Sequence, residues 1–461
     1  MNARREEWWR RTAIRVFEER LKRRATFRYQ SELEASQWCN PLELESLRVG
    51  ALRSLLAHAQ KHCAYYLRSW RERGVDPESV QRTADLARWP VVERETFRAE
   101  AAGIRADVPD LRRMVKATGG STGAPLRFEL DTRSHDKRVA ATFRAYGWAG
   151  AGPGTKQLHL WGTSVTPESF VARHKTRLYN RFYRRRVLSA FSLRDATTLD
   201  FFHELESFKP KVIVAYVNAL HAFARSLEEL KLVPTPPRSI VVGAEKLHSF
   251  QRELIEAVFR APVFETYGSR EFMLMAAQCE RRQGLHITAE NLIVEVVDDT
   301  GQPVPDGVEG QVVVTDLHNY AMPFVRYANG DRAIAGGHCD CGRGLPLLSD
   351  VTGRQADILT TPDRRRVSGL VFPHLLKDFP AVRRFQVVQE RSDTVVLKLE
   401  APGVTNDALE RISSAARSVL GPSVRFSVDP VSEIPLSPSG KLLVVINRTA
   451  GAPPGGEGAR R

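Results

Sequence analysis

The chain has 461 residues, of which 42% are hydrophobic and 26% are charged, so it can bury sizeable cores and is not disordered as a whole. Its formal net charge of +14 permits an anionic ligand, such as a nucleotide, a phosphorylated cofactor or a nucleic acid, without choosing among them. Five cysteines exclude a disulfide scaffold, and no apolar run approaches the roughly 18 residues that span a bilayer. Because the N-terminus also lacks the apolar core of a signal peptide, we expect a cytoplasmic protein.

The first hundred residues are predicted to form helices. The first helix would carry four apolar residues on one face: Trp9, Ala13, Val16 and Leu21. A second helix has Asn40 as its cap and Pro41 at its first position, and its apolar residues repeat at helical intervals: Leu44, Leu47, Leu55, Ala59 and Leu67. The first helix is basic and could lie on a membrane, but its glutamates oppose an anionic surface, so we expect it to dock on the protein.

From about residue 110 the pattern changes to strands. A strand ending at Ala117 leads into the loop TGGSTGAP, and a second strand follows in which Leu126, Phe128 and Leu130 alternate with polar residues. Further on, the apolar runs at 212–216, 239–244 and 262–268 alternate with helical stretches at 218–230 and 249–259. This alternation predicts an α/β fold in which helices flank a parallel sheet.

Ligands bind such sheets beyond the carboxyl ends of the strands. Three segments follow three of the predicted strands: Tyr216, Gly243–Glu245 and Tyr267–Glu271. Segments that are far apart in the chain are therefore predicted to converge on one site.

The loop over 118–123 consists of Thr118, Gly119, Gly120, Ser121, Thr122 and Gly123. Its glycines allow backbone N–H groups to approach oxyanions closely, and its hydroxyls add short donors. It lacks the spacing of a Walker loop and precedes a strand rather than a helix. A flexible hairpin tip is the alternative interpretation.

Three further loops carry residues suited to a nucleotide. Tyr267 offers a flat face for a base, Gly268 allows a tight turn beside Ser269, and Glu271 could hold Mg²⁺ near phosphates. Asp331, in a Gly-Asp turn, could accept two ribose hydroxyls. Lys441, flanked by Gly440, could swing as a point charge toward an oxyanion. Each of these is also an ordinary turn or surface residue when taken alone.

The C-terminal part is predicted to be a smaller α+β unit. Strands are expected near 356–361, 384–390 and 394–400, with a helix near 405–420. We place the large domain at 1–353, with a helical region over 1–105, and the small domain at 354–448. Residues 449–461 are rich in Gly and Pro and are predicted to be disordered.

Taken together, in their order and spacing, these motifs resemble the adenylate-forming superfamily of acyl-CoA synthetases, adenylation domains and luciferases, and within it the phenylacetate–CoA ligase and CapK-like branch. The resemblance covers roughly residues 40–445. It implies a large α/β domain carrying a smaller α+β lid on a hinge. Two positions depart from the family pattern: Leu126 and Arg127, instead of a lysine, follow the loop's proline, and Ala356 precedes Asp357 at the hinge.

The resemblance also implies a role for each motif. Residues 118–123 correspond to the phosphate loop, and Gly243, Ala244 and Glu245 to the segment that passes the adenine. Tyr267 corresponds to the residue that stacks on adenine, Glu271 to the Mg²⁺ ligand and Asp331 to the ribose-binding aspartate. Arg354 corresponds to the nucleotide-contacting arginine of the hinge, and Lys441 to the catalytic lysine.

The implied reaction is ATP-dependent activation of a carboxylic acid and transfer of the acyl group to a thiol, most simply CoA. Transfer to an amine, transfer of AMP itself and a decayed nucleotide-binding scaffold are the alternatives. Trp161, Tyr216, Asn218 and Ala244 are the candidates for the acyl pocket, and two aromatic rings would suit an aryl acid. No nucleic-acid recognition motif is present, and a homodimer is possible.

A Cys/His cluster suggests a structural zinc site. Cys279 and His286 lie seven residues apart, and Cys339 and Cys341 follow in a glycine-rich turn, with His338 as an alternative ligand. Thiolates and imidazoles are the ligands that zinc prefers. Buried cysteines beside a CxC turn are the alternative interpretation.

Overall fold

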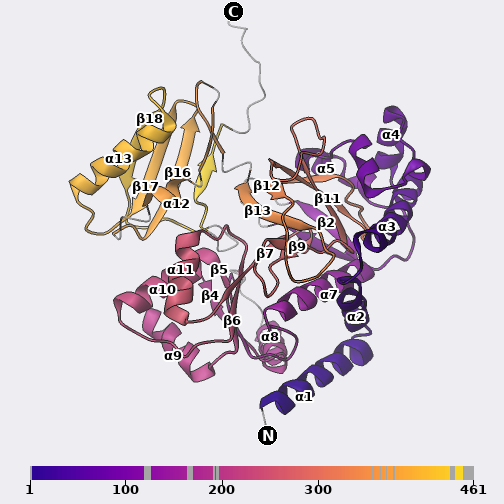
Figure 1. The fold of residues 1–461 in the computed structure, drawn as a ribbon, viewed down its shortest axis with the longest axis horizontal. Coiled ribbons are helices and arrows are strands. Elements are labelled where there is room, and N and C mark those ends of the chain that lie inside the picture. Colours follow the sequence, from indigo (N-terminus) through magenta and orange to yellow (C-terminus); the bar gives the residue numbers. More distant parts are fainter. Residues whose placement is uncertain are drawn as a thin grey trace, which may run out of the picture. The chain divides into compact units, whose positions relative to one another are not determined.

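The computed structural model describes residues 3–118, 126–162, 170–190, 193, 197–354, 358–363, 365–369, 371–376, 379, 381–436 and 442–449. The chain forms two compact units, residues 1–352 and residues 353–461 (Figure 1). The α/β architecture of the first unit and the smaller sheet of the second confirm the predicted fold class.

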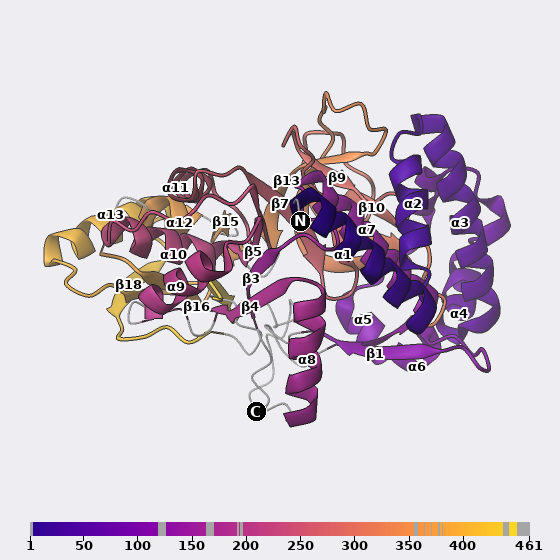
Figure 2. The ribbon, with the colours of Figure 1, turned by 90° about the horizontal axis from the view of Figure 1, so that it is seen from below.

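The first unit begins with helices, which lie together on one side of it (Figure 2). Their bounds are α1 Ala3–Val16, the π-helical segment η1 Phe17–Leu21, α2 Thr26–Ser36, α3 Pro41–His62, α4 Ala64–Arg73, α5 Arg94–Ala99 and α6 Ala101–Ile104, with 3₁₀ turns at Pro77–Ser79 and Thr83–Arg88. Asn40 caps α3 as predicted, because its side chain accepts from the backbone of Leu42 and Glu43 while Glu43 bonds back to Asn40.

The buried faces of these helices differ from the prediction. Trp9 and Leu21 are exposed, whereas Ile14 is completely buried, so α1 docks through another stripe. Glu18 in η1 lies in this interface, where it accepts from the Tyr183 hydroxyl. Leu47 of α3 is also exposed. Apolar spacing alone does not identify the docking face, because residues on either side of the predicted stripe can satisfy the same helical period.

The hairpin that carries the glycine-rich loop joins β1 Arg113–Ala117 to β2 Arg127–Asp131 in antiparallel register. Helix α7, Thr132–Trp148, begins directly after β2. Its cap is Asp131, whose carboxylate accepts from the Ser134 amide at 2.8 Å. The strand therefore passes into the helix without a loop, which fixes α7 beside the hairpin.

One sheet of eleven strands forms the centre of the first unit, in the order β10-β11-β12-β13-β9-β8-β7-β6-β5-β3-β4. The bounds are β3 Gln157–Trp161, β4 Arg185–Ser189, β5 Val212–Tyr216, β6 Ser239–Gly243, β7 Val263–Ser269, β8 Met273–Ala277, β9 Leu285–Ile287, β10 Leu292–Val297, β11 Glu309–Asp316, β12 Tyr327–Ala335 and β13 Leu347–Arg354. The run from β7 to β4 is parallel, as predicted, and the remainder pairs antiparallel where its registers are described.

Helices cover the parallel strands, as Figure 1 shows for α9 Thr198–Phe208, α10 Val217–Glu229 and α11 Ser249–Phe259. Helix α8, Phe170–Phe182, precedes β4. Buried side chains of α10 and α11, such as Phe223 and Phe259, pack with strand residues such as Ile213 in one core. β5 is buried at every position, as a strand with helices on both sides must be.

The second unit contains a four-stranded sheet in the order β18-β17-β16-β19 and a two-stranded sheet β14-β15. Its elements are β14 Ile358–Thr360, β15 Arg366–Ser368, α12 Val371–Leu376, β16 Arg384–Arg391, β17 Thr394–Glu400, α13 Asn406–Leu420, β18 Arg425–Pro430 and β19 Val445–Asn447. Ile412 and Leu420 of α13 pack against Leu397 of the sheet. Residues 450–461 lie outside the described residues, so their disorder stays a prediction.

No helix within the described ranges combines the length and the apolar character that a membrane-spanning segment needs.

We expect Phe324→Ala to destabilise the first unit. Phe324 is fully buried, and its ring stacks on Phe97 of α5 at a centroid distance of 4.4 Å. Emptying such a site costs about 3–5 kcal/mol of unfolding free energy. Thermal unfolding followed by circular dichroism should show a lower midpoint for Phe324→Ala than for Leu199→Ala, a control at a half-exposed position. Equal midpoints would contradict this packing.

Candidate functional site

Adjacent parallel strands end together at one edge of the sheet. Trp161, Tyr216 and Gly243 are the last residues of β3, β5 and β6. The register pairs Tyr216 with Gly243, and β7 pairs with β6 from Val263 to Glu265 before continuing to Ser269. The structure thus brings the strand-end segments that we predicted from the sequence to a single edge.

The backbone at the end of β6 is tightly packed against β7. A Cβ on Gly243 would collide with the hydroxyl of Thr266, so this position has no room for a side chain. Ala244 follows with φ +71°, a left-handed conformation that non-glycine residues adopt infrequently. The Glu245 side chain then accepts from the backbone N–H of Asn218 at 2.8 Å. This bond joins the end of β6 to the start of α10.

Tyr267 and Asp331 are in direct contact. The Tyr267 hydroxyl donates to the Asp331 carboxylate at 2.8 Å, and both residues are buried. The Asn329 amide donates to the Tyr267 hydroxyl and to the same carboxylate, at 2.8 Å and 2.9 Å. The residues to which the family resemblance gives adenine and ribose roles therefore form one hydrogen-bonded group that spans β7 and β12. Gly268 allows β7 to pack closely on β8, since a Cβ there would collide with the carbonyl oxygen of Met273.

Glu271, in the turn between β7 and β8, is a nearly buried carboxylate with 4% exposure. Arg94 donates to its Oε1 at 3.1 Å, and the Tyr327 hydroxyl lies 3.4 Å from the same atom. Burial, together with the charge of Glu271, raises the pKa of Tyr327, so its phenol keeps the proton and can donate it.

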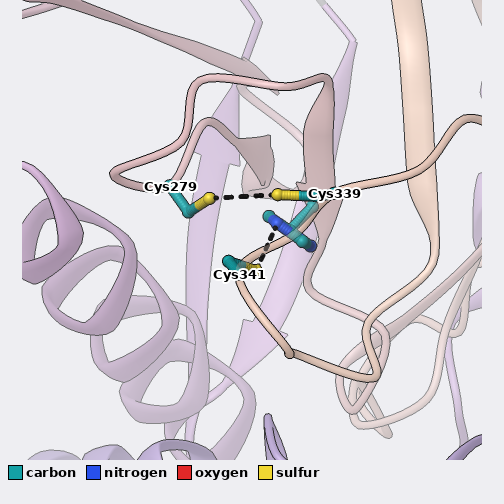
Figure 3. Close-up of side chains that lie close together, drawn as sticks. Cys279, Cys339 and Cys341 are labelled. Carbon is teal, nitrogen blue, oxygen red and sulfur yellow. Dashed lines mark hydrogen bonds between the residues drawn. The ribbon is translucent and has the colours of Figure 1, made fainter.

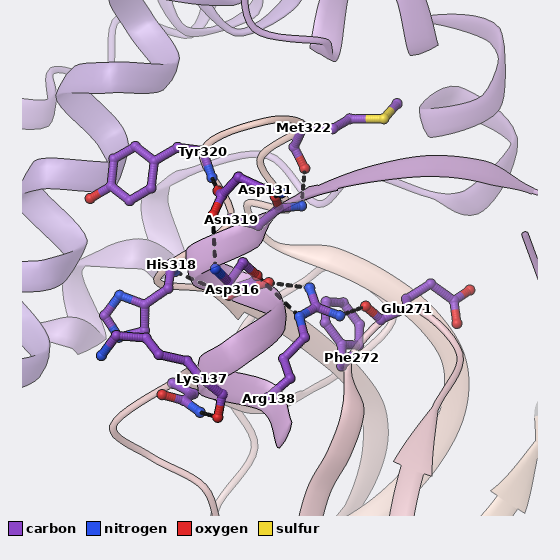
Figure 4. Close-up of polar contacts among 12 residues, drawn as sticks. Asp131, Lys137, Arg138, Glu271, Phe272, Asp316, His318, Asn319, Tyr320 and Met322 are labelled. Carbon is purple, nitrogen blue, oxygen red and sulfur yellow. Dashed lines mark hydrogen bonds and ion pairs between the residues drawn. The ribbon is translucent and has the colours of Figure 1, made fainter. Parts of the chain in front are cut away.

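The backbone of Glu271 is held separately. Figure 4 shows Arg138 of α7 between Asp316 and the main chain of Glu271. Arg138 is 4% exposed, pairs with the Asp316 carboxylate and donates to the Glu271 carbonyl oxygen. Main chain and side chain of Glu271 are thus fixed by different elements.

Thr118 is the described residue of the predicted phosphate loop. Its hydroxyl oxygen accepts from Arg94 at 2.7 Å and from the Leu126 amide at 2.9 Å, which closes the base of the hairpin. Gly119, Gly120, Ser121, Thr122 and Gly123 lie outside the described residues, as does Lys441. Arg127 is exposed on β2. Arg354 is the last residue of β13, at the boundary between the two units.

Sequence reasoning missed three residues at this edge. Arg94 and Asn329 contact predicted site residues, as described above, and Arg270 lies 3.4 Å from the Ala117 carbonyl oxygen at the base of the loop. Arg270 lies inside the predicted segment Tyr267–Glu271, and Asn329 lies two residues before Asp331, so their positions were a usable signal. Arg94 belongs to no motif, and a single sequence gives no sign that it reaches Glu271.

The candidates for the acyl pocket cluster around two aromatic rings. The ring centroids of Trp161 and Tyr216 lie 4.2 Å apart, and burial raises the pKa of Tyr216. The side-chain oxygen of Asn218 accepts from Gln251 at 3.0 Å, so Gln251 orients this amide. Ala244 packs at the edge of the same core as Trp161.

The four predicted zinc ligands come together in the structure. The thiols of Cys279, Cys339 and Cys341 and the ring of His286 place their ligand atoms within 4.8 Å of one another (Figure 3). Burial lowers the pKa of His286 to about 4, so its ring is neutral at pH 7, the form that binds metals. His338, the alternative ligand, is exposed and pairs with Asp340.

Two of the distances between these atoms match those of a zinc site. Ligands at the usual Zn–S and Zn–N distances in a tetrahedron lie about 3.4–3.8 Å apart. The Cys279 and Cys339 sulfurs are 3.5 Å apart, and the Cys341 sulfur is 3.4 Å from His286 Nε2. A four-ligand Cys₃His set is typical of a structural site rather than a catalytic one.

The donor set at Glu271 fits a different metal. Mg²⁺ is usually bound by one or two carboxylates together with phosphate oxygens of a substrate. Glu271 supplies a carboxylate. Arg94 connects it to Thr118 at the base of the candidate phosphate loop. The residues present therefore fit a magnesium–nucleotide complex.

Comparison with known proteins places both parts of the chain in described families. The family model for AMP-binding enzymes matches residues 76–320, more than half of the chain. The model for the CapK C-terminal domain matches residues 359–448.

Curated relatives align over nearly the whole chain. A phenylacetate–coenzyme A ligase from Thermus thermophilus is 26% identical over 91% of this chain and 99% of its own length. Protein CapK from Staphylococcus aureus is 21% identical over 93% of this chain and 94% of its own length. Among solved structures, a 2-hydroxyisobutyryl-CoA ligase in the postadenylation state shares the fold, with a TM-score of 0.70 at 21% identity over 89% of this chain and 91% of that one.

The buried His318 should make stability depend on pH. Burial, aided by the charge of Lys137, lowers its pKa to about 4, while its Nε2 lies 3.0 Å from the Glu290 carbonyl oxygen. In the unfolded chain His318 takes up a proton below about pH 6.5, whereas in the folded chain it does so only near pH 4. The contribution of neutral His318 to the free energy of unfolding is therefore complete above about pH 6.5 and is lost as the pH falls toward 4. At pH 5 the loss is about 2 kcal/mol.

The variant His318→Gln keeps an N–H donor and does not titrate. Between pH 7.5 and pH 5, denaturant unfolding should therefore show wild type losing about 2 kcal/mol more than this variant. The effects of the other buried histidines on the pH dependence are the same in both proteins and cancel in the comparison. A difference between the two proteins that does not change with pH would contradict the lowered pKa.

Proposed function

Because this chain belongs to the AMP-binding, adenylate-forming enzymes, in their phenylacetate–CoA ligase and CapK-like branch, we propose that it activates a carboxylic acid with ATP and transfers the acyl group to a thiol, most simply CoA. The observation that carries the proposal is the convergence of Glu271, Thr118 and the Tyr267–Asp331 pair beside the ends of the parallel strands. ATP, Mg²⁺ and CoA are the small molecules that it requires.

The nucleotide would bind along the strand ends. We assign the adenine to Tyr267 and to the backbone of Gly243–Glu245, and the ribose hydroxyls to Asp331. Tyr267 and Asn329 already orient the Asp331 carboxylate. Binding the ribose would therefore cause little further loss of side-chain entropy at Asp331. The phosphates would lie toward residues 118–123, beside Arg94 and Arg270. Arg354 would contact the nucleotide from the hinge.

The first half-reaction joins two anions. A carboxylate oxygen of the acid attacks the α-phosphorus, the bond to the β-phosphate oxygen breaks, and pyrophosphate leaves. Mg²⁺ held by Glu271 would supply neutralising charge to the phosphate oxygens. We assign Lys441 to stabilise the negative charge that develops at the α-phosphate. The N–H groups of the loop would bind the departing pyrophosphate. The product is an acyl-adenylate, a mixed anhydride.

The second half-reaction moves the acyl group. A thiolate attacks the acyl carbon, and AMP leaves with the electrons of the broken anhydride bond. The similarity to an enzyme named phenylacetate–coenzyme A ligase supports CoA as the acceptor thiol. The Trp161–Tyr216 pair supports an aryl acid, because two rings in contact, with centroids 4.2 Å apart, provide one extended apolar surface.

We also propose that residues 354–448 act as a mobile lid. The division of the chain at Gly353 and the family match over 359–448 support this domain boundary. Enzymes commonly rotate one domain against another about a hinge, so that different residues face the active site in successive steps. Rotation would withdraw Lys441 after adenylation and admit the thiol.

The reaction can be tested with a panel of aryl and aliphatic acids. With ATP and Mg²⁺ we expect pyrophosphate release and an acyl-adenylate from at least one aryl acid, and addition of CoA should release AMP and give the thioester mass. Lys441→Ala and Glu271→Gln should each lower the rate of pyrophosphate release by about 10² to 10³.

Lys398→Ala serves as the matched control, since it removes a lysine from the same small unit on β17 and should keep the wild-type rate. An amide mass with amines in place of CoA, or AMP retained on an acceptor, would overturn the thiol assignment. No AMP with any acid would overturn the proposed function.

We further propose that Cys279, His286, Cys339 and Cys341 bind a structural zinc ion. The four ligands come from the loop that follows β8, from β9 and from the turn before β13, so one ion would hold three segments of the first unit together. Metal binding of this kind contributes directly to folding free energy.

Native protein should contain one zinc per chain by elemental analysis, and Cys339→Ser/Cys341→Ser should contain none. We expect the double variant to unfold on the order of 5 °C lower than wild type. Cys39→Ser changes a cysteine outside the cluster and should keep both the zinc and the midpoint. Native protein without zinc would disprove this site.

A further inference from the structure

Arg94 connects two parts of the site that come from distant regions of the chain. One guanidinium nitrogen, Nη1, donates to Glu271 Oε1 at 3.1 Å, and the other, Nη2, donates to the Thr118 hydroxyl at 2.7 Å. Glu271 is the assigned magnesium ligand, and Thr118 begins the assigned phosphate loop. The side chain of Arg94 is 27% exposed and that of Glu271 is 5% exposed, so the pair is largely shielded from water.

The helix that carries Arg94 is firmly anchored. Two residues before it, Val92 pairs with β12: its amide donates to the Arg326 carbonyl at 2.8 Å, and its carbonyl accepts from Ala328. Three residues after it, Phe97 is completely buried and stacks on Phe324. Val92 is therefore bonded to the strand that supplies Tyr327 and Asp331, and the Phe97 ring also contacts Tyr327 of that strand, with ring centroids 5.2 Å apart.

We propose that Arg94 is a positioning residue, which holds the metal-binding carboxylate of Glu271 and the first residue of the phosphate loop in one fixed relation. This inference rests on the proposed function, because it assigns Arg94 a role toward the magnesium–nucleotide complex. Arg94 acts through Glu271 and Thr118 rather than on the reacting atoms.

The planar fork of arginine explains why this residue type is needed. Two parallel sets of N–H donors leave the guanidinium in fixed directions, so one side chain can hold a carboxylate and a hydroxyl at the same time. A lysine keeps the positive charge but presents it as a point without this geometry. An amide at this position has one donor group and no charge.

The test measures ATP binding by calorimetry, with Mg²⁺ and in EDTA. Arg94→Gln should weaken Mg²⁺-dependent binding by about 10- to 100-fold, the effect of losing hydrogen bonds to a charged group, and should change binding in EDTA much less. Arg94→Lys should show a similar loss. Because the arginine acts through Thr118 as well, adding Thr118→Val to Arg94→Gln should cost less than the sum of the two single changes.

Arg88→Gln is the matched control. Arg88 is a surface arginine paired with Asp85 at 3.4 Å, and its substitution should leave ATP binding unchanged. The KM for the acid should also stay constant in Arg94→Gln, which a general loss of structure would not allow. If Arg94→Gln loses its cooperative thermal transition, the single variants Arg94→Lys and Thr118→Val, each measured with Mg²⁺ and in EDTA, decide the same question.

Binding by Arg94→Gln and Arg94→Lys within twofold of wild type would overturn the inference, and so would an equal loss with and without Mg²⁺. Both results leave the proposed function intact if wild type forms AMP from an acid. Absence of AMP formation by wild type would instead reject the proposed function, whatever the binding data.

Discussion

Glu271 is 4% exposed, and a carboxylate so far removed from water must be matched by donors and cations around it. Those partners come from three parts of the chain. Arg94 of α5 and Tyr327 of β12 meet the side chain, while Arg138 of α7 holds the main chain. The position of this carboxylate thus depends on the correct packing of the N-terminal helices, α7 and the mixed sheet.

The same packing places the nucleotide-binding candidates. β12 contributes Tyr327 to Glu271 and, four residues later, Asp331 to the Tyr267 hydroxyl, so one strand serves both groups. β7 carries Tyr267 and leads into the turn of Glu271. In the sheet β13, β9 and β8 lie between β12 and β7, and none of these strands can slide without breaking its register, so the proposed base, ribose and metal positions are held together by the sheet. A site built on strands and their ends is in this way more rigid than one built on loops alone.

Local signals in the sequence were sufficient for much of the fold. β5 and α11 lie where their patterns placed them, and the Asn40–Pro41 start of α3 is confirmed, since turn, cap and strand signals act within a few residues. Contacts across the chain were not predictable in this way. Arg94 lies 177 residues from Glu271, and Arg138 lies 133 residues from it, so nothing local marks either arginine. The Cys/His cluster was an exception, because its residue types already restrict the chemistry.

The most direct test of the account is a crystal structure with ATP or a stable acyl-adenylate analogue and Mg²⁺. The account predicts the ribose on Asp331, the adenine between Tyr267 and the end of β6, and the metal within coordination distance of Glu271. A nucleotide bound elsewhere on the first unit, with Glu271 still engaged only by Arg94 and Tyr327, would contradict it.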